Sequence, residues 1–201
     1  YNSLGEYQKA IEFYQQSLAI TREIGDRGVE ATSYNNLGAV YNSLGEYQKA
    51  IEFYQQSLAI TREIGDRGVE AASYNNLGNV YKSLGEYQKA IEFYQQSLAI
   101  LREIGDRGVE AKSWFNLGLT YYKLKRISEA KEAYLQAQEL YQALGLAADV
   151  QDCDNKIRQL ETQKYPLIVA FFLGVIKFPL VLIGGIIVAL WRLLKRWLRK
   201  A

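Results

Sequence analysis

A sequence of forty residues recurs along this chain with almost no change. The segment YNSLGEYQKA begins at residues 1 and 41, and the variant YKSLGEYQKA begins at residue 81. Residues 1–40 and 41–80 differ at two positions, and residues 41–80 and 81–120 differ at seven. Repeats of this kind stack in one dimension, because each unit buries its apolar side only against its neighbours.

Each repeat predicts two amphipathic helices and no strand, because no segment alternates with period two. Residues 69–84 form the first helix and residues 86–104 the second. Glycine at position 85 ends the first helix, and Glu86 suits the positive end of the second helix dipole. The segment GDRG at residues 105–108 predicts the loop that follows. The apolar residues at helical spacing are Tyr74, Leu77, Val80, Tyr81, Leu84, Tyr87, Ala90, Ile91, Tyr94, Leu98 and Leu101.

The recurring residues resemble the tetratricopeptide repeat over roughly residues 1–146. The period of 40 exceeds the ~34 of the common form, and the proline that usually ends the second helix is absent. Both departures are similar to the long-helix variant of kinesin light chains and bacterial repeat arrays. The residues that carry the resemblance are Tyr74-x-x-Leu77-Gly78-x-x-Tyr81, then Tyr87-x-x-Ala90-x-x-x-Tyr94, and in the next unit Trp114, Leu117, Gly118, Tyr121, Ala130, Tyr134 and Ala137.

The resemblance implies an all-α fold, a helix-turn-helix repeat solenoid wound as a right-handed superhelix. The expected units are a partial repeat at 1–27 and full repeats at 28–67, 68–107 and 108–146. Residues 147–164 lack the repeat signature, but Val150, Cys153, Ile157 and Leu160 form one apolar stripe opposite charged residues. We therefore expect a solvating cap helix there, with Cys153 as a buried structural thiol. A C-terminal hydrophobic, transmembrane helix is expected to follow at residues 165–191.

The three units differ from one another mainly on one side of their first helices. Ala72, Asn75, Asn79 and Lys82 lie on one stripe, beside a packing stripe that barely varies. In the family that this chain resembles, the first helices line a concave groove that binds peptides. We therefore predict a partner-binding surface in that groove, made of Asn35, Asn42, Asn75, Asn79, Lys82, Lys112, Phe115, Leu119, Tyr122 and Lys123.

The residue types on this surface indicate the kind of partner. Asparagine offers donors and an acceptor to the backbone of an extended peptide, and lysine favours an acidic side chain or a C-terminal carboxylate. Relatives that clamp carboxylates use asparagine and lysine on these faces. Two other interpretations stay open. In the first, exposed positions vary between the units without any function. In the second, Phe115, Leu119 and Tyr122 pack on the cap helix or on the tail.

The composition changes abruptly after residue 164. Residues 166–191 hold 17 Leu, Ile, Val or Phe residues and one charge. As a helix they measure about 39 Å, enough to cross a hydrocarbon core of about 30 Å. Interfacial aromatics flank the segment and a basic amphipathic tail, residues 192–201, suits anionic headgroups. The predicted membrane residues are Tyr165, Lys177, Pro179, Trp191, Arg192, Lys195, Arg196, Trp197, Arg199 and Lys200.

Three arrangements of this segment compete: a single span, a re-entrant hairpin that breaks near Lys177 and Pro179, and burial against a partner protein. Lys177 lies near the centre, where a lysine marks a candidate functional site or snorkels to the interface. One role for Lys177 is to line an oligomeric pore, which implies a homo-oligomer. The protein is thus expected in a membrane, single-pass or monotopic. We expect the repeats in the cytoplasm, where a hairpin leaves both ends.

Composition excludes several classes of function. The absence of histidine removes most zinc sites and every triad that uses a histidine base, and one cysteine cannot form an internal disulfide. We expect no metal, cofactor or catalytic residue. The net charge of +2 divides into +6 on residues 166–201 and −4 on residues 1–165, so lipid explains the basic tail better than nucleic acid does.

These observations favour a membrane-anchored scaffold that is not an enzyme and that binds a protein or peptide in its repeats. One alternative is a membrane-permeabilising effector, an oligomeric pore with a repeat sensing arm. Another is the C-terminal region of a larger enzyme that lies upstream, since the sequence begins at Tyr1 and is expected to be part of a longer chain.

Overall fold

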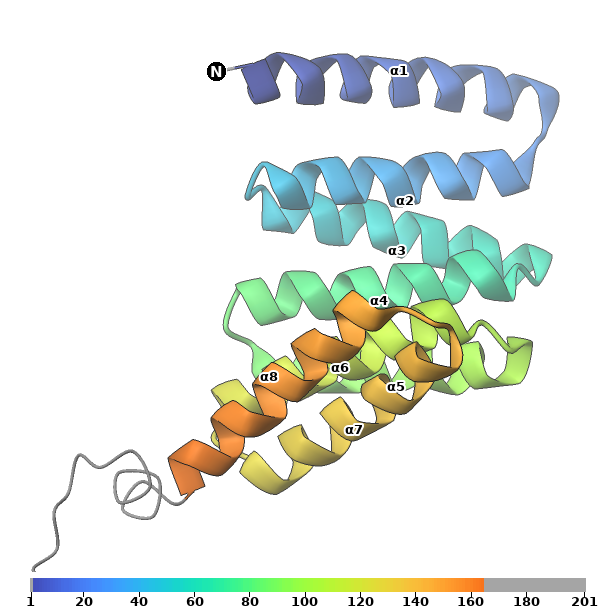
Figure 1. The fold of residues 1–201 in the computed structure, drawn as a ribbon. Helices are drawn as coiled ribbons and strands as arrows, with labels where there is room; N and C mark the ends of the chain where they lie inside the picture. Colours follow the sequence, from blue (N-terminus) through green and yellow to red (C-terminus); the bar gives the residue numbers. More distant parts are fainter. Residues whose placement is uncertain (1, 165–201) are drawn as a thin grey trace, which may run out of the picture. The chain divides into compact units, whose positions relative to one another are not determined.

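The computed structural model describes residues 2–164, and every regular element among them is an α-helix. Figure 1 shows α1, three helix pairs and α8 in chain order. This architecture confirms the predicted all-helical repeat solenoid. The helices are α1 (Asn2–Ile24), α2 (Arg27–Ser43), α3 (Tyr47–Ile64), α4 (Arg67–Ser83), α5 (Tyr87–Ile104), α6 (Arg107–Lys123), α7 (Ile127–Ala143) and α8 (Ala147–Lys164).

Residues Tyr1–Ile157 form one compact unit, and Arg158–Ala201 form a second. Of the second unit, the structure describes only the C-terminal end of α8. The predicted membrane segment and basic tail, residues 165–201, therefore lie outside the described residues. Between residues 2 and 164, no helix is both long enough and apolar enough to cross a bilayer.

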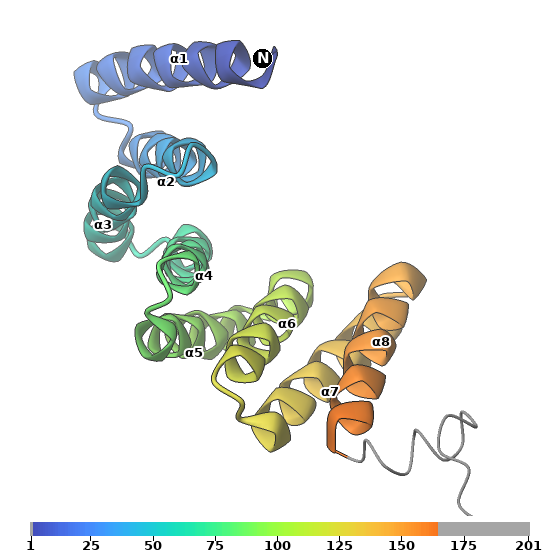
Figure 2. The same cartoon turned by 90° about the vertical axis from the view of Figure 1, so that its left-hand side faces the viewer.

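In the first unit, each helix packs against the helices that precede and follow it. We call α2, α4 and α6 the A helices and α3, α5 and α7 the B helices. Each A helix packs against its own B helix and against the helix before it, and in Figure 2 α2 and α4 lie on the opposite side of the stack from α3 and α5. Helix α1 has the sequence of a B helix, because residues 5–24 recur at 45–64.

The loop between repeats is shorter than the GDRG segment predicts. Asp66 Oδ1 accepts a hydrogen bond from the backbone N–H of Val69 at 3.0 Å, so α4 begins at Arg67 and Gly68 lies in its first turn. Gly65, which ends α3, has a φ of 74° that glycine adopts without steric cost. A side-chain cap satisfies one of the free N–H groups of a helix start, and the aspartate therefore extends the helix backward.

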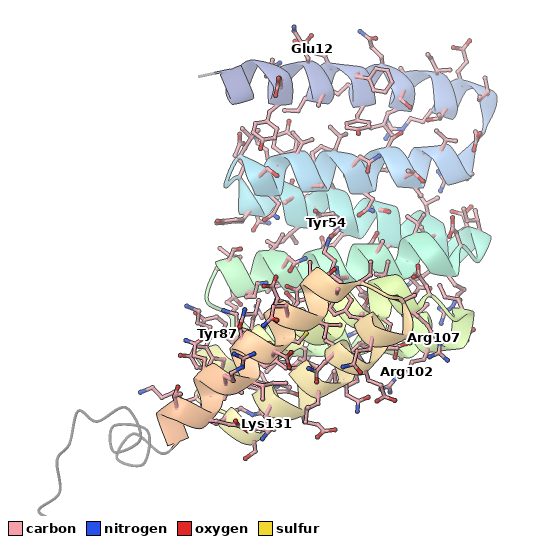
Figure 3. All side chains as sticks on the ribbon, viewed as in Figure 1. Glu12, Tyr54, Tyr87, Arg102, Arg107 and Lys131 are labelled. Atoms are coloured by element: carbon pink, nitrogen blue, oxygen red, sulfur yellow. The ribbon has the colours of Figure 1, made fainter. Side chains whose placement is uncertain are left out.

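The two helices of a pair are in tight contact at a glycine. A Cβ atom on Gly78 would lie 2.6 Å from Cε1 of Tyr94, whose side chain is completely buried. The same contact joins Gly38 to Tyr54, which is labelled in Figure 3, and Gly118 to Tyr134. The glycine of the repeat signature thus makes room for an aromatic ring of the partner helix.

A buried carboxylate near the start of α2 and of α4 takes part in ion pairs that reach both neighbouring helices. Glu70 of α4 is 5% exposed and accepts from Arg62 of α3 at 3.3 Å and from Arg67 of its own helix. Arg67 also pairs with Glu103 of α5 at 2.9 Å. An unpaired buried charge is costly, and the two arginines pair with Glu70 while they tie α4 to both neighbours.

The two ends of the described stack differ from its middle. Residues 4–6 are helical in α1, whereas the identical residues 44–46 form the turn between α2 and α3. Within residues 2–164 no A helix precedes α1, so no helix pair holds this sequence in a turn. At the other end, Cys153 of α8 is buried in a cluster with Ala111, Ala137 and Tyr141, as expected for a structural thiol.

Candidate partner-binding surface

The ten predicted surface residues lie on the three A helices, and their exposure divides them. Lys112 and Lys123 of α6 are exposed, whereas Asn75 of α4 is 6% exposed and belongs to the packing between helices. The other members are half-buried. These are Asn35, Asn42, Asn79, Lys82, Phe115, Leu119 and Tyr122.

A cluster at Lys82 is the most elaborate part of this surface. Lys82 Nζ donates to Oδ1 of Asn79 at 3.2 Å and to Oδ1 of Asn116 at 3.1 Å, and it lies 6.0 Å from the ring centre of Tyr94. Tyr94 OH donates to the same Asn79 oxygen at 2.8 Å. The ammonium group therefore bridges α4 and α6 through neutral amides, and burial lowers the pKa of Lys82.

Asn35 and Asn75 hold successive A helices together. Oδ1 of Asn35 accepts from Nδ2 of Asn76 at 3.1 Å, which joins α2 to α4. Oδ1 of Asn75 accepts from Ser113 Oγ at 3.0 Å, which joins α4 to α6. The structure thus gives these two asparagines a packing role that the sequence comparison did not predict.

The position occupied by Lys82 differs in each unit. It is Asn42 in α2 and Tyr122 in α6. Asn42 Oδ1 is buried and has no hydrogen-bond partner. A buried acceptor of this kind carries a desolvation penalty, so a donor group placed beside Asn42 would be stabilised there.

The third unit carries aromatic and aliphatic residues where the second has amides. Phe115 packs at 5.5 Å from the ring of Tyr134 and against the cluster around Cys153. Leu119 takes the place of Asn79, and Tyr134 OH is buried without a partner. Phe115 therefore packs toward α8, which is the second of the interpretations left open above.

The lysines of the A helices lack acidic partners. Among residues 2–164, no carboxylate pairs with Lys82, Lys112 or Lys123 within 4.0 Å. On the B helices, by contrast, Lys49 pairs with Glu46 and Lys89 pairs with Glu86, each at 2.6 Å. Carboxylates thus neutralise Lys49 and Lys89, whereas the positive charge of the lysines on α4 and α6 stays unpaired.

A second set of asparagines belongs to this surface and was missed from the sequence. Asn36, Asn76 and Asn116 occupy the same position in each unit and are half-buried. Asn76 and Asn116 make the contacts with Asn35 and Lys82 described above. These three asparagines recur in the sequence. The surface residues were predicted from positions that vary between the repeat units, and a position that does not vary is missed in this way.

Two cavities lie away from this surface. One, of about 300 Å³, lies at the turn between α7 and α8 and is lined by residues that include Gln142, Leu146 and Val150. The other, of about 240 Å³, lies along α1 and is lined by Phe13, Gln16, Ser17, Ile20 and Thr21.

Comparison with known proteins agrees with this fold. The family profile described as Tetratricopeptide repeat matches residues 1–63 and 69–143. No curated protein matches the chain.

Several solved structures resemble the chain. BtubC (BKLC) from P. vanneervenii is 21% identical with a TM-score of 0.61, and the match covers 81% of this chain and 76% of that one. A putative kinesin light chain with nearly identical TPR-like repeats from Podosopora anserina is 22% identical with a TM-score of 0.57, covering 82% and 91%. Aspartyl phosphate phosphatase F from Bacillus subtilis is 15% identical with a TM-score of 0.76, covering 87% and 46%. At such identities the likeness concerns the fold alone.

Proposed function

Because the chain belongs to the tetratricopeptide repeat family, we propose that it is an interaction scaffold that binds an acidic segment of a partner protein along α4 and α6. The observation that carries this proposal is the set of lysines without acidic partners, Lys82, Lys112 and Lys123, beside the amides of the A helices. We propose no catalytic role for the repeats.

The cluster at Lys82 supports an anionic ligand in particular. Its ammonium group is partly removed from bulk water, and the amide oxygens around it carry no net charge. A ligand carboxylate placed there gains a charge-assisted hydrogen bond in a site of low dielectric, where such bonds are strongest. The half-buried asparagines beside it supply donors and acceptors for the backbone of an extended peptide.

The C-terminal segment adds a second part to the proposal: attachment of the scaffold to a lipid bilayer. Support comes from composition, since residues 166–191 are apolar and residues 192–201 carry basic residues. The repeats then face the cytoplasm, and association of membrane segments through Lys177 would give a homo-oligomer.

Binding is tested with a fluorescein-labelled oligoglutamate peptide, with oligoglutamine and oligolysine peptides of equal length as controls. We expect the full chain to bind only the acidic peptide. Lys82→Met should weaken binding by about tenfold or more, because one charge-assisted hydrogen bond contributes roughly 1.5–3 kcal/mol. Lys89→Met removes a lysine that already pairs with Glu86 and should change little. Equal binding of all three peptides would contradict the proposal.

The pH dependence of the same assay isolates Lys82. Burial lowers the pKa of Lys82 in the free protein, and a bound carboxylate favours the charged form. Affinity for oligoglutamate should therefore be lost as the pH rises through the lowered pKa. Lys82→Met should abolish this dependence, and a profile identical in both proteins would assign the anion to another group.

Membrane attachment is tested by extraction of the full chain from a membrane fraction. High salt and alkaline carbonate should fail to release it, because the apolar segment is insensitive to ionic strength, whereas detergent should succeed. Release by salt alone would leave only a peripheral basic helix. Protease access to both ends from one side would favour the hairpin over the span.

A further inference from the structure

An arginine side chain lies at the junction between a B helix and the A helix that follows it. Where α3 meets α4, Arg62 donates to Glu70 at 3.3 Å and lies 5.4 Å from the ring centre of Tyr74. Arg102, labelled in Figure 3, has the same role where α5 meets α6: it donates to a buried carboxylate at 3.1 Å and lies 5.1 Å from the centre of an aromatic ring. At both junctions a guanidinium group therefore fills the space between a carboxylate and a ring.

The junction between α7 and α8 keeps the register of the repeat but changes these side chains. Helix α8 begins forty residues after α6, and the glycine before each of them has the same left-handed conformation, with φ values of 72° and 74°. The positions of the arginine, the glutamate and the aromatic residue are taken by Gln142, Val150 and Asp154. Each of these side chains is shorter than its counterpart, so the junction retains the backbone of the repeat without the side chains that fill it.

The cavity of about 300 Å³ described above lies at this junction. Leu146, Ala147 and Val150 supply apolar lining, and Gln142 and Asp154 supply polar groups. None of the described residues that line the cavity is basic. The cavity thus lies where the earlier junctions hold an arginine, and it offers apolar surface for methylene groups together with a carboxylate for a charged head group.

A glutamine holds the carboxylate of Asp154 in place. Gln138 Nε2 donates to Asp154 Oδ1 at 2.6 Å, and both side chains are half-buried. In the preceding unit the two positions are Leu98 and Trp114, so a polar pair replaces two apolar residues here. An ionised carboxylate has about four lone-pair sites. One hydrogen bond therefore orients Asp154 and leaves it able to accept further hydrogen bonds from a ligand.

The beginning of α8 has a charge that favours a cation. Asp149, Asp152 and Asp154 lie within residues 147–155, and this stretch holds no lysine or arginine. Between residues 2 and 164, no basic side chain forms a salt bridge with any of the three. On α5, by contrast, Glu103 pairs with Arg67 at 2.9 Å. The electrostatic field at the cavity therefore attracts a positive group.

We propose that the cavity between α7 and α8 is a binding site for a guanidinium group, of the kind that an arginine side chain carries. The guanidinium nitrogens donate to the carboxylate of Asp154, and the methylene stem lies against Leu146 and Val150. The planar guanidinium matches a carboxylate with two parallel hydrogen bonds, which an ammonium group does not. This site is separate from the surface with unpaired lysines on α4 and α6, and it takes a ligand group of the opposite charge.

The test uses the full chain in detergent, isotope-labelled for NMR spectroscopy, with Nα-acetylarginine amide as the probe. We expect the side-chain amide signals of Gln138 and Gln142 to shift in a saturable manner. Nα-acetylcitrulline amide, which has an uncharged urea in place of the guanidinium, should bind about tenfold more weakly, because a charge-assisted hydrogen bond is roughly twice as strong as a neutral one. Nα-acetyllysine amide should also bind more weakly than the arginine probe. Equal affinity for all three probes would overturn the proposal.

Two aspartates of α8 provide a matched pair of variants. Asp154→Asn keeps an oxygen that accepts from Gln138 but removes the charge, and it should weaken binding of the arginine probe by about tenfold. Asp152→Asn removes the same charge from an exposed side chain that does not line the cavity, and it should change the affinity little because solvent and salt screen that charge. Equal losses in the two variants would overturn the proposal, since they would indicate a general attraction to an acidic helix.

Two further variants concern arginines of the chain itself. Gln142→Arg places an arginine where the earlier junctions have one, so it should abolish probe binding and raise the midpoint of thermal unfolding; unchanged probe binding would overturn the proposal. A chain in which Arg192, Arg196 and Arg199 are changed to glutamine should bind the probe as the wild type does. Binding by this variant alone would support the site and show that the chain's own arginines compete with the probe, whereas binding by neither protein would overturn it.

Discussion

A substitution at the contact between Gly78 and Tyr94 tests directly how the two helices of a pair pack together. In Gly78→Ala the new Cβ atom would lie 2.6, 2.7 and 2.9 Å from three atoms of the Tyr94 ring. The ring is 0% exposed, and its hydroxyl is fixed by Asn79 at 2.8 Å. Neither side can yield without moving α4 away from α5.

The expected cost follows from two opposing effects. Overpacking of a filled core costs typically 1–3 kcal/mol, and a rigid buried ring places this site near the upper end. Replacing glycine by alanine inside a helix returns about 1 kcal/mol. The net destabilisation is therefore about 2 kcal/mol, or a midpoint lower by about 4–8 °C for a chain of this length.

A matched substitution separates the clash from the helix propensity. Gly68→Ala lies in the same helix, but its Cβ atom would meet only Asp66 Oδ1 at 3.5 Å, an ordinary contact. It should raise the midpoint of thermal unfolding, followed by circular dichroism, by the propensity gain alone. In a Tyr94→Leu background, Gly78→Ala should lose most of its cost. If Gly78→Ala and Gly68→Ala change the midpoint of thermal unfolding equally in the wild-type background, α4 and α5 do not pack tightly at Gly78.

Three further predictions follow from single residues. Burial and the nearby carboxylates raise the pKa of Cys153 to about 12, so a thiol-specific reagent at mildly alkaline pH should label it far more slowly in the folded protein than in urea. Lys125 has a φ of 59° where the other units have Gly45 and Gly85, so Lys125→Gly should stabilise the fold by roughly 1 kcal/mol in urea unfolding. Asn79→Leu should destabilise it by about 1–3 kcal/mol, since the hydroxyl of Tyr94 loses its acceptor; an unchanged midpoint would show that this hydrogen bond does not stabilise the fold.

The helices of the repeat were largely predictable because hydrophobic spacing carries most of the information. The expected segments 69–84 and 86–104 compare with α4 at Arg67–Ser83 and α5 at Tyr87–Ile104. The error at the start of α4 has a local cause. Asp66 is a turn-forming residue by composition, but its side chain caps the helix, and only the geometry of the backbone N–H groups decides between the two roles.

The partner-binding surface was predictable only in part, because a side chain on an A helix faces both solvent and the next unit. Asn75 and Asn79 looked free to bind a ligand, since they vary between repeats. In the structure Asn75 bonds to Ser113 of the following A helix and Asn79 accepts from Tyr94. Sequence spacing places a residue on a stripe, but it does not show how far the neighbouring helix overlaps that stripe.

The same reasoning explains why the last repeat differs most. An asparagine at the position of Phe115 would bond to a serine of the next A helix, but the next helix is α8, which offers a cluster around Cys153 instead. Phe115 fits that cluster, and no ligand is needed to account for it.

Lys82 differs, because the amides that hold it, Asn79 and Asn116, belong to two successive repeats. A structural bond between two repeats needs only a neutral donor, as Asn76 provides for Asn35. The charge of Lys82 is therefore the feature of this surface that packing does not require, and the comparison of Lys82→Met with wild type measures what that charge is for.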